Sequence, residues 1–133
     1  VGYTALTANT TGHNNTASGH SALYSNTTGT NAVAVGRNAL YSNINGAHNT
    51  AVGDSALVNN TSASYNTAVG KSSLQNNTTG SNNTASGYQS LYSNTTGASN
   101  TASGYQALKY TTGSNNTALG TYAGDNITTG DYN

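Results

Sequence analysis

Residues 66–82 read NTAVGKSSLQNNTTGSN, and residues 83–99 follow as NTASGYQSLYSNTTGAS. The second stretch repeats the first, and the same 17-residue pattern extends in both directions along the chain. Glycine recurs at the fifth place of the unit, leucine at the ninth and a further glycine at the fifteenth. Three series in one phase identify an internal repeat with the consensus N-T-A-[SV]-G-x-x-A-L-Y-S-N-T-T-G-x-N.

Each series runs through nearly the whole chain. The fifth-place glycines are Gly2, Gly19, Gly36, Gly53, Gly70, Gly87, Gly104 and Gly120. The ninth-place leucines are Leu6, Leu23, Leu40, Leu57, Leu74, Leu91 and Leu108. The fifteenth place holds Gly12, Gly29, Gly46, Gly80, Gly97, Gly113 and Gly130, with Ala63 in the one missing position. The last fifth-place step is 16 residues, because the copy at 100–115 is one residue short.

The final copy, residues 116–132, differs from the others at two places. Gly124 replaces the leucine, and Ile127 replaces the asparagine of the twelfth place. We expect Ile127 to fill the space left by the missing leucine. The alternative is an atypical terminal repeat of the kind that ends many solenoids.

The composition excludes a thick hydrophobic core. Only 5% of the 133 residues are charged, the formal net charge is zero, and tyrosine is the only aromatic type. Such a chain is either disordered or stacks each residue type on its own copy, and fixed-period apolar positions favour stacking. Neutrality argues against a nucleic-acid partner, and no apolar run approaches the ~20 residues of a membrane span. We therefore expect one repeat domain over residues 1–133, without membrane insertion.

The unit length favours strands over helices. Seventeen residues are too few for a helix-turn-helix repeat, and two glycines per unit disfavour helix. Each unit contains two candidate extended segments, Asn-Thr-Ala-Val-Gly and Ala-Leu-Tyr-Ser, separated by turn residues. Successive coils would pair in parallel about 4.8 Å apart. The sequence predicts an all-β parallel β-solenoid of about eight coils, each with two or three short strands.

The repeated positions have predictable roles in such a coil. The fifth-place glycines are expected to adopt positive φ or to allow close approach of two backbones. The leucines are expected to form the core ladder. A buried or corner amide ladder is predicted for Asn9, Asn26, Asn43, Asn60, Asn77 and Asn94, with a ligand-binding row as the alternative.

Adjacent apolar residues predict a partner chain. Side chains alternate along a strand, so Ala39 and Leu40, like Ala56 and Leu57, should point to opposite faces. One coil interior buries only one face. The other face is either exposed, which single alanines or threonines tolerate, or packed against another chain, and we expect packing because the repeat turns a small residue into an apolar stripe. Two columns of tyrosine either seal this seam or stack on sugars. The columns are Tyr24, Tyr41 and Tyr92 after leucine, and Tyr3, Tyr88 and Tyr105 after glycine.

Residues 49–53 and 66–70, both Asn-Thr-Ala-Val-Gly, and Ala-Val-Ala-Val-Gly at 32–36 resemble a known repeat. It is the N-[ST]-x-A-[IV]-G repeat in the head domains of trimeric autotransporter adhesins. Similar Asn-Thr-Ala-x-Gly arrays occur in bacterial and phage tail-fibre-like proteins. The resemblance covers essentially the whole chain, although the head repeat is shorter than 17 residues. It implies a left-handed β-roll, a homotrimer of chains side by side, and a place at the cell surface, outside the cell or in a virion fibre.

The two ends of the sequence are in compatible phase. The chain begins at the fourth place of the unit and finishes at the first, so a head-to-tail neighbour would almost resume the pattern. Open coil ends are unpaired strand edges, which favour end-to-end addition into a filament. The alternative is that these borders mark where a longer repeat region was divided.

Residues for catalysis or metal binding do not form a pattern. His13, His20 and His48 occupy different places of the unit and read as solvated turn residues. The three carboxylates, Asp54, Asp125 and Asp131, are scattered, without a pair spaced for acid–base chemistry or a calcium loop. We therefore expect no enzymatic activity, no metal and no cofactor.

The expected function is structural: a subunit of an extracellular fibre or adhesive surface appendage. Ice binding is an alternative, because threonine-rich neutral solenoids present flat hydroxyl arrays. Against it, Thr10 and Thr11 are adjacent, as are Thr27 and Thr28, so one of each pair should turn away. A passive adhesin that binds glycans or host surfaces through its tyrosine and asparagine columns is a further alternative.

Overall fold

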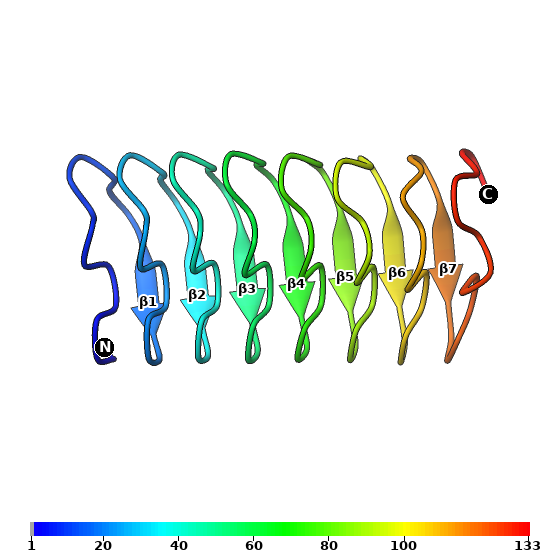
Figure 1. Cartoon of the computed structure of the whole chain (residues 1–133), viewed down its shortest axis with the longest axis horizontal. Coiled ribbons are helices and arrows are strands. Elements are labelled where there is room, and N and C mark those ends of the chain that lie inside the picture. The colour runs from blue at the N-terminus through cyan, green and yellow to red at the C-terminus, as the bar shows by residue number, and fades with distance from the viewer. Residues whose placement is uncertain (1) are drawn as a thin grey trace.

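The computed structural model describes residues 2–133 and shows an all-β parallel solenoid (Figure 1). Seven three-residue strands form one sheet in chain order, and every neighbouring pair is parallel. The strands are β1 (Thr16–Ser18), β2 (Val33–Val35), β3 (Thr50–Val52), β4 (Thr67–Val69), β5 (Thr84–Ser86), β6 (Thr101–Ser103) and β7 (Thr117–Leu119). The described part of the chain holds no helix of the length and apolarity that a membrane span requires. The predicted fold class is confirmed.

The register follows the repeat. Thr50 pairs with Thr67 and Ala51 with Ala68, so each residue lies beside its own copy in the next coil. The step is 17 residues throughout except between β6 and β7, where Thr101 pairs with Thr117 across the short copy. Seven strands make six full steps, slightly fewer than the eight coils expected from length alone. The chain before β1 and after β7 continues the same winding (Figure 1).

Each coil contains only one strand, and the prediction of a second strand at Ala-Leu-Tyr-Ser was wrong. The leucine of this segment has positive φ in every described coil from Leu6 to Leu108, with values between 48° and 56°. This left-handed conformation is incompatible with an extended strand, although the backbone still bonds to the next coil. The amide of Leu40, for example, donates to the carbonyl of Ala56 at 3.0 Å. A left-handed leucine costs roughly 1–2 kcal/mol, which burial of its side chain offsets.

The left-handed leucine also changes which side chains face inward. Ala39 and Leu40 are adjacent, yet both are completely buried within the single chain, and the same holds for Ala56 and Leu57. Alternation fails here because it requires extended backbone on both residues. The expectation that one coil buries only one residue of each pair was therefore wrong, and these pairs give no argument for or against a partner chain. Only the strands alternate: Ala34 is buried, while Val33 and Val35 on either side are exposed.

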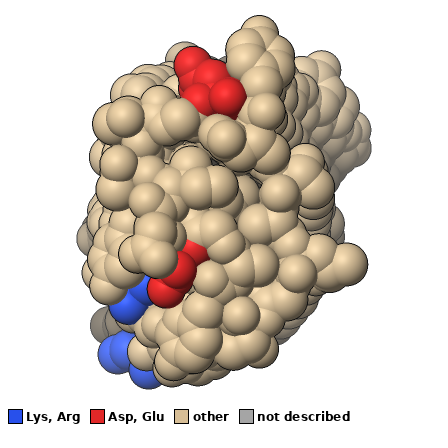
Figure 2. Space-filling model, turned by 90° about the vertical axis from the view of Figure 1, so that its right-hand side faces the viewer, with Lys and Arg blue, Asp and Glu red and all other residues tan. Residues whose placement is uncertain are grey.

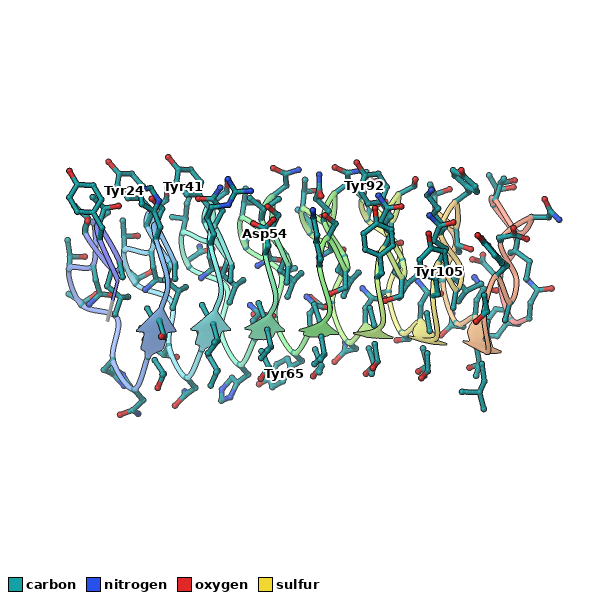
Figure 3. All side chains as sticks on the ribbon, turned by 90° about the horizontal axis from the view of Figure 1, so that it is seen from below. Tyr24, Tyr41, Asp54, Tyr65, Tyr92 and Tyr105 are labelled. Carbon is teal, nitrogen blue, oxygen red and sulfur yellow. The ribbon has the colours of Figure 1, made fainter. Side chains whose placement is uncertain are left out.

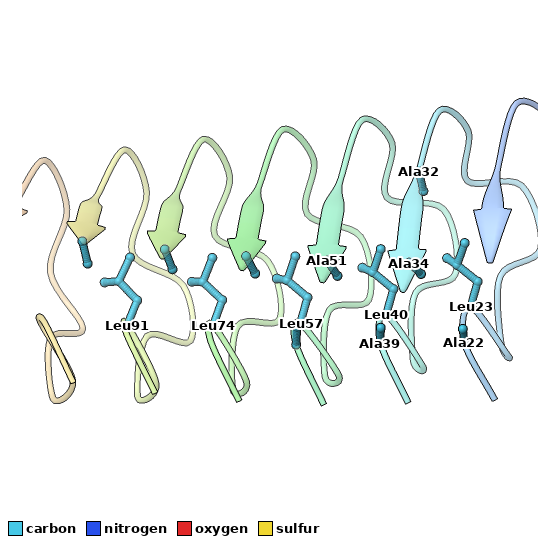
Figure 4. Close-up of a cluster of buried hydrophobic side chains, with 14 of the residues drawn as sticks. Ala22, Leu23, Ala32, Ala34, Ala39, Leu40, Ala51, Leu57, Leu74 and Leu91 are labelled. Atoms are coloured by element: carbon cyan, nitrogen blue, oxygen red, sulfur yellow. The ribbon is translucent and has the colours of Figure 1, made fainter. Parts of the chain in front are cut away.

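In each coil the core consists of one leucine and a few alanines (Figure 4). Six leucines, from Leu23 to Leu108, are fully buried and stack coil upon coil, as predicted. They pack against the inward alanines of the strands, such as Ala51 and Ala68. Each coil therefore buries a small layer, and the layers form one continuous core only when neighbours stack.

The terminal coil shows how the core tolerates a missing leucine. Ile127 packs against the core cluster. A Cβ placed on Gly124 would lie 3.3 Å from the Cδ1 of Ile127, so Ile127 reaches into the space beside Gly124. The Cδ2 of Leu108 lies closer still, at 2.7 Å, so Ile127 shares this place with the leucine of the preceding coil.

The fifth-place glycines satisfy both predicted requirements. Gly53 has φ of 137°, and a Cβ on it would lie 2.6 Å from the carbonyl carbon of Gly70 in the next coil. A side chain is therefore disfavoured by the backbone conformation and by the neighbouring backbone. From Gly2 to Gly104 the column lies against the backbone of the next coil, whereas Gly120 has positive φ but no backbone beside it.

Candidate functional site

The twelfth-place asparagines form a buried ladder, as predicted. Asn26, Asn43, Asn60, Asn77 and Asn94 are completely buried. The Nδ2 of Asn60 donates to the Oδ1 of Asn43 at 2.8 Å and to the carbonyl of Ala63 at 3.1 Å. The other members repeat these two bonds. Because the amides are buried and bonded to one another, they serve the fold, and the ligand-row alternative loses its support.

A second asparagine ladder, which we did not predict, runs through the first place of the unit. The Oδ1 of Asn66 accepts from the backbone amide of Asn83 at 2.9 Å, and its Nδ2 donates to the carbonyl of Gly80 at 2.9 Å. The same arrangement recurs at Asn49, Asn83, Asn100 and Asn116. Its sequence signal is the asparagine that opens each Asn-Thr-Ala motif at the repeat step.

The outer side of the seven strands is flat and free of charge; we call it the sheet face. It consists of the second- and fourth-place side chains, which point outward. They are Thr16, Ser18, Val33, Val35, Thr50, Val52, Thr67, Val69, Thr84, Ser86, Thr101, Ser103, Thr117 and Leu119. The exposed aliphatic residues Val33, Val35, Val69 and Leu119 all lie here, and only Ile44 lies elsewhere among residues 2–133. The sheet face therefore combines methyl and hydroxyl groups in regular rows.

The adjacent threonines lie on a different part of the coil. The first threonine of several pairs uses its hydroxyl within the fold: Oγ1 of Thr10 donates to the carbonyl of Thr27 at 2.9 Å. Thr78 makes the same bond to Thr95 at 3.1 Å. These hydroxyls are therefore part of the inter-coil bonding. The regular outward array is on the sheet face, at positions two residues apart.

The tyrosines form stacks between successive coils on other sides of the rod. The rings of Tyr24 and Tyr41 are 5.1 Å apart and nearly parallel, and those of Tyr88 and Tyr105 are 5.2 Å apart. Figure 3 shows Tyr24, Tyr41 and Tyr92 along one edge, opposite the strands, whereas Tyr65 lies on the strand side. Tyr3 packs against His20. Where two rings stack, each covers a face of the other, which leaves fewer faces for a sugar.

The few charges lie outside the sheet face. Arg37, Asp54 and Lys71 share the sixth place in three successive coils. The guanidinium of Arg37 contacts Asp54 at 3.0 and 3.2 Å, and this hydrogen-bonded pair holds the pKa of Asp54 below its usual range. Seen from the end, the surface is otherwise largely uncharged (Figure 2).

The three histidines of the described part are dispersed over the surface. His13, His20 and His48 are exposed, and His48 stacks on Tyr65 with ring centroids 4.9 Å apart. Within residues 2–133, no three His, Cys, Asp or Glu side chains gather as metal ligands would, and no pocket is present. The candidate functional surfaces are therefore the sheet face and the tyrosine stacks.

Comparisons with protein-family models, curated proteins and solved structures find no match for this chain. The structure defines its class as a parallel β-solenoid repeat protein. Its function must be argued from its own surfaces.

Proposed function

We propose that this chain is a rod segment of an extracellular fibre or adhesive surface appendage. One observation carries the proposal: successive coils are joined by the same backbone ladder, by a leucine stack up to Leu108 and by two asparagine ladders, of which one is interrupted at Thr111. Such a molecule is an elongated body whose length is set by the number of repeats. The sequence resemblance to appendage head repeats supports the same role, at the cell surface or in a virion fibre.

The sheet face is the best surface for side-by-side assembly into a trimer. It is flat and uncharged, and it holds nearly all the exposed aliphatic side chains of residues 2–133. Its rows repeat at the coil spacing of about 4.8 Å, which a second copy of the chain matches row for row. Seven strands of three residues give a face about 30 Å long and ~10 Å wide, or roughly 300 Å². This is less than half of the ~800 Å² that each partner buries in a standard interface, so association should strengthen with repeat number.

Head-to-tail addition is a second part of the proposal. The described end coils leave ladder donors and acceptors unused on their outer sides, and successive coils pair by simple translation. A further coil, in the same chain or in another copy, would satisfy them. A contact of this kind does not close on itself and therefore propagates into a filament.

Electron microscopy and solution mass together test the fibre proposal. Native material should show filaments with an axial layer line near 4.8 Å, and the isolated chain should form trimers at high concentration. Val69→Lys places a charge on the sheet face and should abolish trimers. Asn59→Lys, on an exposed side chain away from the strands, is the matched control and should not. A strictly monomeric chain that forms no filaments would refute the proposal.

Ice binding is a second candidate, because the sheet face presents regular hydroxyl and methyl rows at positions two residues apart. Thermal hysteresis of the dilute monomer distinguishes the two functions. Strong hysteresis that Val69→Lys removes would favour ice over a second chain as the partner of this face. Glycan binding is less well supported, since stacked neighbours already cover several tyrosine ring faces.

A further inference from the structure

Tyrosine is the principal oxidisable side chain of this protein. The chain has 10 Tyr, whereas Cys, Met and Trp are all absent. Cysteine and methionine are the side chains that oxidants ordinarily modify first. In their absence, one-electron oxidation is directed to the phenols.

Two pairs of these phenols are held in contact by the coil spacing. Tyr24 and Tyr41 occupy the same place in successive coils, with ring centroids 5.1 Å apart and an interplanar angle of 4°. Tyr88 and Tyr105 are related in the same way, at 5.2 Å and 18°. Tyr41 is 36% exposed and Tyr105 44% exposed, so soluble oxidants reach both pairs.

The other tyrosines are more exposed or differently partnered. Tyr65 is 60% exposed but stacks on His48. Tyr122 meets Tyr105 edge-on, at an interplanar angle of 78°. The most exposed tyrosines are therefore not the ones stacked on another tyrosine. An experiment can thus tell whether exposure or stacking decides which tyrosines react.

We propose that Tyr24–Tyr41 and Tyr88–Tyr105 are sites of oxidative cross-linking between adjacent coils, formed with a haem peroxidase and hydrogen peroxide. Each phenol loses one electron and one proton, which leaves a phenoxyl radical with spin on the ring carbons next to the C–O carbon. Two such carbons on neighbouring rings form a C–C bond. Each carbon then releases its hydrogen as a proton and the phenol is restored. Two hydrogen atoms leave in all, and they reduce one hydrogen peroxide to two waters.

The cross-link would join coils that are otherwise held only by non-covalent ladders. Its two ends lie 17 residues apart, so it closes a short loop between one coil and the next. A closed loop restricts the unfolded chain, as a disulfide does. The chain, which contains no cysteine, would thereby obtain a covalent staple that survives reducing conditions. This proposal does not depend on what the fibre binds.

Tryptic mapping after peroxidase treatment tests the assignment. Cleavage after Arg37, Lys71 and Lys109 separates Tyr24 in peptide 1–37 from Tyr41 in peptide 38–71. The expected product joins these two peptides, with a mass two hydrogen atoms below their sum. Tyr88 and Tyr105 both lie in peptide 72–109, which should lose two hydrogen atoms without gaining a partner. Both products should form in the same yield when the protein is diluted tenfold, because the pairs are intramolecular.

Matched variants provide the control. Tyr41→Phe keeps the ring but removes the phenol, and should eliminate the 1–37/38–71 product. Tyr65→Phe removes a phenol from the same tryptic peptide and should leave the yield unchanged. If the product persists in Tyr41→Phe, or if Tyr3 and Tyr65 dominate the linked pairs, exposure controls the chemistry and the proposal is wrong. A yield that falls in proportion to dilution would overturn it as well.

Discussion

Thr111 occupies the place that follows Asn94 in the twelfth-place ladder, and the Oδ1 of Asn94 consequently has no hydrogen-bond donor. The amide of Thr111 bonds to the carbonyl of Leu108 as that of Asn94 bonds to Leu91, which identifies the equivalent places. The hydroxyl of Thr111 donates instead to the carbonyl of Ile127 at 2.7 Å. The short copy therefore interrupts one ladder, while the first-place ladder continues through Asn100 and Asn116.

Restoring this donor should stabilise the protein. Thr111→Asn places an amide beside the buried Asn94 Oδ1, and an unsatisfied buried acceptor costs about 1–3 kcal/mol. After subtracting the lost bond to Ile127, we expect a gain of about 1 kcal/mol in the free energy of unfolding, measured with urea. Thr96→Asn, on an exposed threonine of the preceding coil, should change stability by less than ~0.5 kcal/mol. A destabilised Thr111→Asn would show that the short copy cannot hold an asparagine.

Breaking the ladder in its middle should have a large cost. Asn60→Ala leaves the Asn43 Oδ1 without its side-chain donor, removes one of two donors to the Ala63 carbonyl, and removes the acceptor of Asn77 Nδ2. Two groups, Asn43 Oδ1 and Asn77 Nδ2, lose a partner, and at about 1–3 kcal/mol for each we expect a loss of at least about 2 kcal/mol. Asn59→Ala, which removes an exposed amide next to it, should cost less than ~0.5 kcal/mol. Similar losses for the two variants would contradict the structural role assigned to Asn60.

A leucine-to-isoleucine exchange tests the left-handed turn directly. Volume-conserving core exchanges usually cost less than about 1.5 kcal/mol. At Leu57, where φ is 51°, a β-branched residue is strongly disfavoured. We expect Leu57→Ile to cost more than ~2 kcal/mol. In Val69→Ile, on a strand, the change should be near zero. If Leu57→Ile lowers the free energy of unfolding no more than an ordinary core exchange does, the segment is extended and the left-handed conformation is wrong.

Alanine substitutions at Gly53 and Gly120 distinguish the destabilisation caused by positive φ from that caused by steric overlap with the next coil. Gly53→Ala meets both, because φ is 137° and the next coil lies 2.6 Å from the new Cβ. Gly120→Ala meets mainly the strain, since φ is 122° but the nearest atom lies 3.9 Å away. Strain alone costs about 1–3 kcal/mol. The urea midpoint should therefore fall further for Gly53→Ala, and equal losses would assign the whole effect to φ.

The Arg37–Asp54 pair should make stability depend weakly on pH in the acid range. Because Arg37 lowers the pKa of folded Asp54, the pair contributes stability above the ordinary aspartate pKa of about 3.9. That contribution is lost as the pH falls through the lowered pKa, and it is small because the pair is exposed. Asp54→Asn should remove this acid loss from the urea midpoint. Asp125→Asn should retain it, since Asp125 forms no ion pair within residues 2–133. An acid loss that persists in Asp54→Asn would contradict this assignment.

The repeat period was sufficient to predict the parallel stacking, because a residue that recurs at a constant step must lie beside its own copy. It also predicted the leucine core and the Asn60 ladder. The conformation of Leu57 could not be predicted in this way, since leucine rarely adopts positive φ and Ala-Leu-Tyr-Ser has the residue types of a strand. That one conformation decides whether Ala56 and Leu57 share a face, and hence whether this pair argues for a partner chain.

The sheet face shows a different limit of sequence reasoning. Thr67 and Val69 flank an alanine, and the sequence alone does not say which side of this strand is buried; their outward position follows once Ala68 is placed inside. The Asn66 ladder was visible in the sequence as a regular column. Its pairing with the amide of Asn83 could not be seen without the backbone course.

The residue-by-residue register between coils has a genetic consequence. Duplication or loss of one 17-residue unit joins places that already pair throughout the rod, so every contact is regenerated at the new junction. Recombination between copies of the coding repeat would therefore yield folded variants whose rod length differs in steps of about 4.8 Å, the spacing of one coil. Loss of a single residue from a repeat has a different effect. In the copy that contains Thr111, which is one residue short, the asparagine ladder is interrupted and the Oδ1 of Asn94 has no donor. Selection on such a chain can thus adjust length freely, while it keeps the reading frame of the repeat almost fixed.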